Sequence, residues 1–257
     1  MRRTRSLLAL AALVAPMAFT SSTPTPTPPS TGEQVVAAMH DRYAATWYHT
    51  LTFVQRSIWY KADGSEARVQ TWHEAASMPG KLRIDIGDST ARNGAIYRSD
   101  STYDFSAGKL SRVSGERNPL LILGFDVYAQ SAAHTDAVLR EEGVDLSKFH
   151  RDTFQGRPVY VVGALAGDTT STQFWVDGER LLFVRLIQPN RAKTNWQDIR
   201  FNRYVPEPGG WLAIQVQVLT GGRVVYAEEY SDVRVNDSLN PELWNPQAWQ
   251  TVPLWWR

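Results

Sequence analysis

The sequence predicts a mainly β protein of the α+β class, in which a strongly curved antiparallel sheet or open half-barrel carries an N-terminal helix and an inserted helical pair. Apolar and polar residues alternate along residues 82–86 and 212–218, as in strands that are buried on one face. Asp-Gly or Gly-Gly dipeptides at positions 63–64, 177–178 and 221–222 lie between extended segments and indicate hairpin turns. The helical patterns fall between two blocks of such segments, so we expect the helices on the concave side of one sheet.

The N-terminus has the features of a secretory signal peptide over residues 1–22. Three arginines precede the apolar residues 7–14, and small residues follow at the expected cleavage zone. The apolar run is shorter than the about 20 residues that a membrane-spanning helix needs. A twin-arginine signal is the weaker alternative. Residues 23–31, TPTPTPPST, contain nothing to bury and predict an extended, mobile Pro/Thr-rich tether.

The composition narrows the class of protein. Lys and Arg number 27 against 26 Asp and Glu, so the basic excess of a nucleic-acid-binding domain is missing. The absence of cysteine excludes disulfides, thiol catalysis and the lipidated cysteine of a bacterial lipoprotein. We therefore expect an exported periplasmic protein that is neither lipidated nor membrane-spanning, with residues 32–257 folded as a single β domain. Ten Trp and ten Tyr suit either a ligand-lined cavity or cross-strand aromatic pairs.

The N-terminal half begins with a helix and continues as strands. A Thr-x-x-Gln capping box at residues 31–34 precedes apolar residues at 35, 36, 39, 43 and 47, whose helical spacing predicts one face laid on the sheet. In residues 81–86, Leu and Ile alternate with Lys81, Arg83 and Asp85, which predicts that these three charged residues face water. Extended segments are expected at residues 51–61, 66–77, 81–86, 95–98, 102–105 and 109–113.

Residues 118–128 predict a short helix that is apolar on every side. Asn118 is a favourable cap, Pro119 is tolerated at the first helical position, and Gly124 weakens the helix without excluding it. Such a helix is either packed inside an ordinary core or covers an oily ligand. A second helix is expected at residues 131–142, followed by strands at 157–165, 173–176, 181–188, 196–204, 211–219 and 224–230.

The sequence contains little evidence of a catalytic site. The five histidines are scattered, a His-Arg-Asp triplet at residues 150–152 lacks the glycine-rich loop of a kinase, and no Gly-x-Ser-x-Gly elbow occurs. Asp85 with Asp88, or Glu228 with Glu229, would suit an acid–base pair if they faced one another, but solvated sheet faces are the better interpretation. We therefore expect no enzyme, no cofactor and no metal site.

Short motifs occur in a characteristic order along the chain. They are Phe53-Val-Gln55, the turn Asp63-Gly64, Pro79-Gly80-Lys81-Leu82-Arg83, the hairpin Arg98-Ser-Asp100-Ser-Thr-Tyr103-Asp-Phe105 and the closing Leu243-Trp244-Asn245-Pro246. Together they make the chain similar to outer-membrane lipoprotein-sorting proteins of the LolA type. The departures from that family are Met78 in place of an arginine, Ser101 in place of the hairpin glycine, and a longer chain with a Trp-rich end at residues 254–256.

The resemblance implies a non-catalytic periplasmic carrier, whose concave apolar face, closed by a helical lid at residues 118–128 and 131–142, holds the acyl chains of a lipoprotein or another acyl-chain ligand. It also implies donor and acceptor proteins at the inner and outer membranes. The alternatives are a relative that carries or senses another lipid, an envelope protein-interaction module with a filled core and, least favoured, a hydrolase. The expected ligand-binding residues are Phe53, Leu82, Ile84, Leu120, Leu121, Ile122, Leu123, Phe125, Leu212, Ile214 and Val216.

Overall fold

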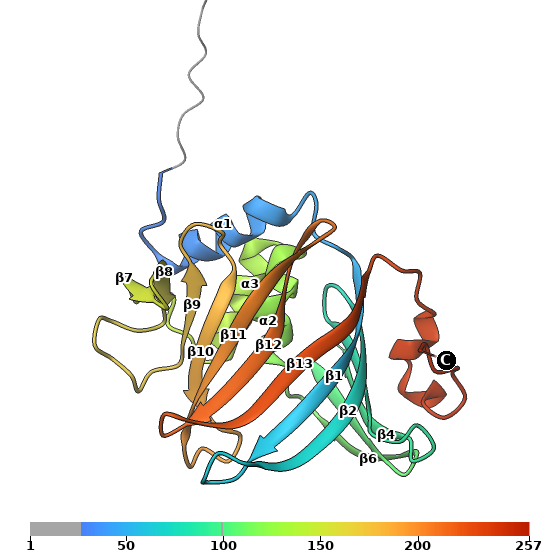
Figure 1. The fold of residues 1–257 in the computed structure, drawn as a ribbon. Helices are drawn as coiled ribbons and strands as arrows, with labels where there is room; N and C mark the ends of the chain where they lie inside the picture. The colour runs from blue at the N-terminus through green and yellow to red at the C-terminus, as the bar shows by residue number, and fades with distance from the viewer. Residues whose placement is uncertain (1–26, 99, 257) are drawn as a thin grey trace, which may run out of the picture.

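A computed structural model of the protein describes residues 27–98 and 100–256, so the expected signal peptide at residues 1–22 lies outside the described residues. Within the described part of the chain, 13 strands form one antiparallel sheet that is strongly curved and open (Figure 1). The strands are β1 (Thr50–Tyr60), β2 (Glu66–Ser77), β3 (Lys81–Ile86), β4 (Asn93–Arg98), β5 (Ser101–Ser106), β6 (Lys109–Ser114), β7 (Phe149–Phe154), β8 (Arg157–Val162), β9 (Gln173–Asp177), β10 (Phe183–Pro189), β11 (Trp196–Glu207), β12 (Gly210–Thr220) and β13 (Arg223–Val235). Their order across the sheet is β6-β5-β4-β3-β2-β1-β13-β12-β11-β10-β9-β8-β7. The mainly β fold expected from the alternating segments is confirmed.

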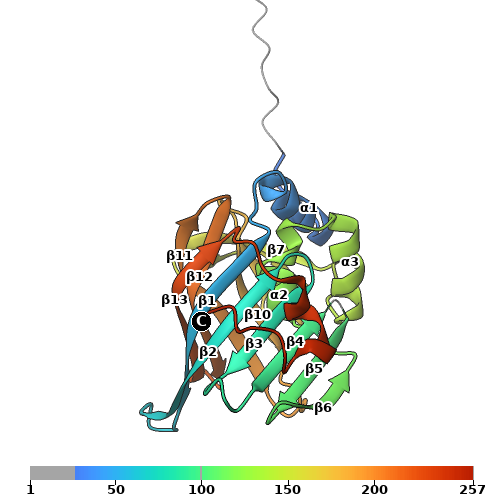
Figure 2. The same cartoon turned by 90° about the vertical axis from the view of Figure 1, so that its right-hand side faces the viewer.

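The first and last strands meet in the middle of this sheet. On β1, Leu51 lies opposite Ala76 of β2 on one side and Val235 of β13 on the other. The two edge strands, β6 and β7, follow one another in the sequence, so residues 115–148 have to connect opposite edges. This helical crossing contains α2 (Pro119–Gly124), a 3₁₀ turn (Asp126–Tyr128) and α3 (Ala132–Glu141), and it runs along the concave side of the sheet (Figures 1 and 2).

The helix caps form as the sequence predicts. The backbone N–H of Gln34 donates to Thr31 Oγ1 at 3.2 Å and begins α1 (Gly32–Tyr43), which ends before Trp47. At α2, the N–H groups of Leu120 and Leu121 donate to Asn118 Oδ1 at 3.0 and 3.3 Å. Each cap oxygen satisfies backbone donors that have no partner within the helix. α1 packs against α3, the 3₁₀ turn and β8, so the crossing as well as the sheet covers its apolar face.

The strand β7 was not expected from the sequence. Its two apolar residues, Phe149 and Phe154, enclose four polar ones, so the segment has no alternating pattern. It forms because β8 offers it a complete antiparallel register, in which Phe149 lies opposite Val162. The His-Arg-Asp triplet at residues 150–152 lies within this edge strand.

The prediction that Arg83 and Asp85 face water is wrong. Arg83 is 0% exposed and Asp85 is 5% exposed, and Arg83 Nε and Nη2 donate to the Asp85 carboxylate at 2.7 and 2.8 Å. The C-terminal segment, residues 236–256, lies over the convex face of β2, β3 and β4 and covers this pair (Figure 2). The guanidinium carbon of Arg83 is 3.9 Å from the centre of the Trp249 ring, which is itself 1% exposed. Both faces of β3 are therefore buried.

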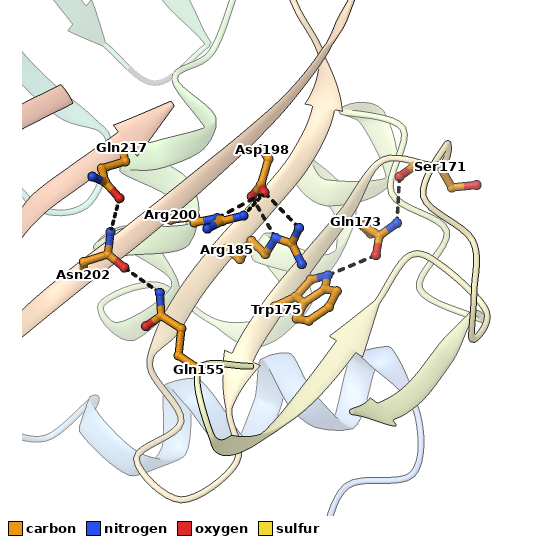
Figure 3. A network of polar contacts seen from close by, with 9 residues as sticks. All are labelled: Gln155, Ser171, Gln173, Trp175, Arg185, Asp198, Arg200, Asn202 and Gln217. Carbon is orange, nitrogen blue, oxygen red and sulfur yellow. Dashed lines mark hydrogen bonds and ion pairs between the residues drawn. The ribbon is translucent and has the colours of Figure 1, made fainter. Parts of the chain in front are cut away.

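The convex face of the other half of the sheet carries a polar network instead (Figure 3). Arg185 donates two hydrogen bonds to the Asp198 carboxylate, at 2.7 and 2.9 Å, and Arg200 Nη2 donates to the same group at 2.7 Å. Asp198 and Arg200 alternate along β11 with Ile199 and Phe201, which belong to the core. This half of the sheet thus keeps the polar outer face that alternation predicts.

Among the described residues, none of the helices has the length and apolar character required to cross a bilayer.

Candidate functional site

A cavity of about 820 Å³ lies between the concave face of the sheet and α2. Its volume falls within the roughly 300–1,000 Å³ that is typical of small-molecule sites. Side chains of β1 to β4, β11 to β13, the loop before β11 and the crossing line it: Leu51, Phe53, Gln55, Trp59, Trp72, Glu74, Ala76, Leu82, Ile84, Tyr97, Asn118, Leu120, Leu121, Phe125, Arg191, Gln197, Phe201, Val218, Val225, Tyr226, Glu228 and Tyr230. Most of this lining is aliphatic or aromatic.

The structure brings part of the predicted site together in this lining. Phe53, Leu82, Ile84, Leu120, Leu121 and Phe125 line the cavity, whereas Ile122, Leu123, Leu212, Ile214 and Val216 do not.

Of the residues outside the lining, Ile214 is partly buried against the packed core and the other four belong to it. Ile122 and Leu123 are 6% and 1% exposed. Val216 lies opposite both Phe201 and Glu228, so β12 presents it on the concave side, where it is fully buried. Alternation identifies the inward face of a strand correctly, but it does not say which inward residues the crossing covers.

Three contacts hold the helical crossing across the concave face. A Cβ added to Gly124 would lie 3.0 Å from Phe201 Cε1, so glycine allows α2 to approach β11 closely. The N–H of Gly80, in the turn between β2 and β3, donates to Asp126 Oδ1 at 2.9 Å. The N–H of Phe183 on β10 donates to the Tyr128 hydroxyl at 2.9 Å. The crossing therefore bridges the two halves of the sheet and closes the cavity on one side.

One wall of the cavity is polar. We call the lining residues Gln55, Glu74, Tyr226, Glu228 and Tyr230, together with the buried Ser57 that accepts a hydrogen bond from Gln55, the polar cluster. Gln55 Nε2 donates to Ser57 Oγ at 2.8 Å and to Tyr226 Oη at 3.0 Å, and the Tyr230 hydroxyl donates to the Glu228 carboxylate. Gln55 is the glutamine of the Phe-x-Gln motif, of which only Phe53 was among the expected ligand-binding residues.

Burial raises the pKa of both carboxyl groups in the polar cluster. The pKa of Glu74 is raised well above its usual range by burial and by the nearby charge of Glu228. Burial also raises the pKa of Glu228, against hydrogen bonds from Tyr230 and Tyr226 that lower it. Two carboxylates in a space of low dielectric repel one another and lose hydration, so the cavity disfavours the doubly ionised state.

Aromatic rings surround this end of the cavity. The centroid of Trp59 lies 6.0 Å from that of Trp72 and 5.0 Å from that of Tyr226, and the centroids of Trp72 and Tyr226 are 6.5 Å apart. The guanidinium of Arg68, on the solvent-exposed part of β2, lies 3.8 Å from the Trp59 ring. The faces of these rings carry negative electrostatic potential, so they add to the acidic character of the cluster.

Sequence reasoning missed Glu74 and the aromatic rings beside it, and the preferred interpretation of Asp85 and Glu228 as residues of solvated sheet faces is wrong, because Asp85 is buried and Glu228 lines the cavity. Glu228 and Glu229 are adjacent on β13 and point to opposite faces, and Glu229 pairs with Arg56 Nη1 at 3.1 Å on the convex side. The available signal was an acidic residue on a face otherwise occupied by large rings, as in Trp72-x-Glu74 and Tyr226-x-Glu228-x-Tyr230. That pattern becomes visible only once the inward face of each strand is known.

A larger hollow, of about 1030 Å³, lies on the convex side between the C-terminal segment and strands β1, β2 and β13. Asp232, Arg234 and Asp237 are part of its lining, and its position outside the sheet separates it from the crossing. The inner cavity is the better candidate site because it is mostly apolar and converges on a few polar groups. Its described lining contains no serine, histidine or lysine, and no group of three or more metal-ligating side chains occurs among the described residues.

No protein-family model and no curated protein matches this chain. A solved putative outer membrane lipoprotein-sorting protein domain from Vibrio parahaemolyticus is similar in structure, with a TM-score of 0.58 and 13% identity over 85% of this chain and 97% of that one. The chain has a LolA-like fold. A DUF1329 family protein from Desulfovibrio piger matches with a TM-score of 0.58 at 12% identity, over 85% of this chain and 98% of that one. At such identities the likeness shows the LolA-like fold alone, while the cavity is a property of this chain.

Proposed function

We propose that the protein is a non-catalytic carrier or binder of acyl chains in the periplasm. The observation that carries this proposal is the cavity of about 820 Å³, whose lining is mostly apolar and which is covered on one side by a helix with no polar face. Burial of each methylene group of a ligand contributes about 0.8 kcal/mol, so a single acyl chain supplies enough free energy to offset the conformational entropy that it loses on binding.

The finer role that we propose is outer-membrane lipoprotein sorting or related lipid transport. Its support is the fold shared with the lipoprotein-sorting domain and the order of the motifs along the chain. In this role the ligand is the acylated end of a lipoprotein, and donor and acceptor proteins at the two membranes are the partners. Export with cleavage of residues 1–22 and a chain without cysteine, and therefore without lipidation, belong to the same proposal.

Extraction of lipid from the native protein tests the proposal. The protein is purified from the periplasm without detergent, and its organic extract is analysed by mass spectrometry. We expect acyl lipid in stoichiometric amount, together with saturable uptake of a fluorescent fatty acid by the extracted protein. A clean extract and no uptake would favour an interaction module with a filled core. Turnover of an ester or glycoside substrate would contradict the non-catalytic role.

A further inference from the structure

The cavity contains a carboxyl group that the protein leaves without a partner. Glu74 is 5% exposed and lines the cavity. Among the described residues, no group donates a hydrogen bond to its carboxyl and no cation pairs with it. A buried carboxyl without a donor is costly, because it loses its hydration and gains nothing in return. Because this carboxyl group lines the cavity, a ligand that enters the cavity can supply the missing partner.

The groups around Glu74 favour a cation over an anion, because an entering positive charge stabilises the ionised form of two carboxyl groups that the empty cavity keeps from ionising together. Glu228 acts on it electrostatically and accepts the hydrogen bond of Tyr230, so Glu228 is arranged as an acceptor. The rings of Trp59, Trp72 and Tyr226 line the same cavity and are all within 6.5 Å of one another, centroid to centroid. Carboxylates and aromatic faces together form the environment in which proteins hold ammonium groups.

The cations near the cavity are engaged elsewhere. Arg191 lines the cavity, but its side chain is 62% exposed and pairs with Glu116. The guanidinium of Arg68 rests on Trp59. Neither arginine contacts Glu74 or Glu228, so within the described part of the chain no side chain neutralises the two carboxyl groups.

We propose that the cavity selects amphiphiles whose polar head carries a positive charge, with the ammonium group placed between Glu74, Glu228 and the rings of Trp59, Trp72 and Tyr226. The apolar tail then lies along Phe53, Leu82, Ile84 and the inner side of α2. This inference rests on the proposed acyl-chain binding and adds the chemical class of the head group.

Matched single-chain amphiphiles test the head-group preference. Dodecyltrimethylammonium, dodecanol and dodecanoate each contain a twelve-carbon chain and differ in charge. Their affinities are measured by isothermal titration calorimetry at pH 7.5, below the concentrations at which they form micelles. We expect the cation to bind at least about tenfold more tightly than dodecanoate, because the anion meets both carboxyl groups.

Two variants test whether the polar cluster is the source of the head-group preference. In Glu74→Gln the preference for the cation should fall to about threefold or less, while dodecanol binds as before. Glu74→Gln removes a buried titratable group and should not lower the melting temperature, so a loss of binding is not a loss of fold. Glu229→Gln is the matched control, since this adjacent residue points to the convex face and pairs with Arg56.

The outcomes distinguish the two proposals. Equal binding of all three amphiphiles, or tighter binding of dodecanoate, would overturn the charge preference and leave acyl-chain binding standing. If none of the three binds, both proposals fail. A preference that survives in Glu74→Gln would show that the polar cluster is not its source, and would also overturn the inference.

Discussion

At the scale of single residues, Asp126 connects the protonation state of the molecule to its helical crossing. It is 3% exposed and accepts a hydrogen bond from the N–H of Gly80. Burial raises the pKa of its carboxyl to about 7, against the ordinary value of 3.8. At pH values between these two pKa values, the folded protein therefore keeps a proton that the unfolded chain has lost. The contribution of this group to stability is complete below the lower pKa and is lost as pH rises toward the upper one.

This titration predicts the behaviour of Asp126→Asn. Asparagine stays neutral and still accepts the hydrogen bond of Gly80, so the variant should lack this part of the pH dependence. We expect wild type, relative to the variant, to lose up to about 4 kcal/mol between pH 4 and pH 8. Urea unfolding at several pH values measures the difference. Glu74 and Glu228 titrate in both proteins, so their contributions cancel in the difference between wild type and variant. Parallel curves of unfolding free energy against pH would therefore contradict the assignment to Asp126.

The pair of Arg83 and Asp85 leads to a second prediction at this scale. Arg83→Ala leaves the Asp85 carboxylate buried without its partner and removes the stacking on Trp249. We expect a loss of about 3–5 kcal/mol in the free energy of unfolding. The control is Arg56→Ala, whose side chain is 44% exposed and pairs with Glu66 and Glu229. Removing an exposed pair should cost about 1 kcal/mol or less, and similar losses in the two variants would contradict the account of Arg83.

At the scale of elements, α2 has one side toward the cavity and one toward the core. Leu121 lines the cavity, and Leu123 is 1% exposed in the packed core. We expect Leu121→Glu to weaken uptake of a fluorescent fatty acid with a limited change in melting temperature. Leu123→Glu buries an unpaired charge among packed side chains, which costs several kcal/mol and should lower the melting temperature sharply.

Probe uptake and melting temperature are both measured for Leu121→Glu and Leu123→Glu, with Gln217→Glu on the convex face as control. A large loss of melting temperature in Leu121→Glu, or unchanged probe binding, would favour a helix that only fills the core.

The elements also show where sequence reasoning succeeds and where it stops. Caps such as Thr31 and Asn118 and turns such as Asp63-Gly64 depend on residues a few positions apart, and they were predicted correctly. The outer face of β3 is covered by a segment that follows it by more than 140 residues, so its alternation of Arg83 and Asp85 with Leu82 and Ile84 had the pattern of a half-exposed strand. The polar cluster depends on the register between β1, β2 and β13. Periodicity within one strand contains no information about that register.

At the scale of the whole molecule, the proposed export predicts the N-terminus of the mature protein. The apolar run ends before the polar tether, so cleavage should leave a chain that begins near residues 19–23. N-terminal sequencing or intact mass of the exported protein measures this. Retention of Met1 would contradict the export argument, and the proposed periplasmic location with it.

The central pairing of β1 with β13 determines when the cavity comes into existence. β1 is the first strand to be synthesised and β13 the last, and the register that joins them runs from Leu51 and Val235 to Trp59 and Tyr226. Contacts so distant in sequence form late, because a long loop has to close before they contribute free energy. Until then the edge of β1 that pairs with β13 stays free, and the side chains on one side of the future cavity have no opposite side to face. An incomplete chain thus has no cavity for a ligand, and on the proposed function an acyl chain would bind only after the last strand has joined the sheet.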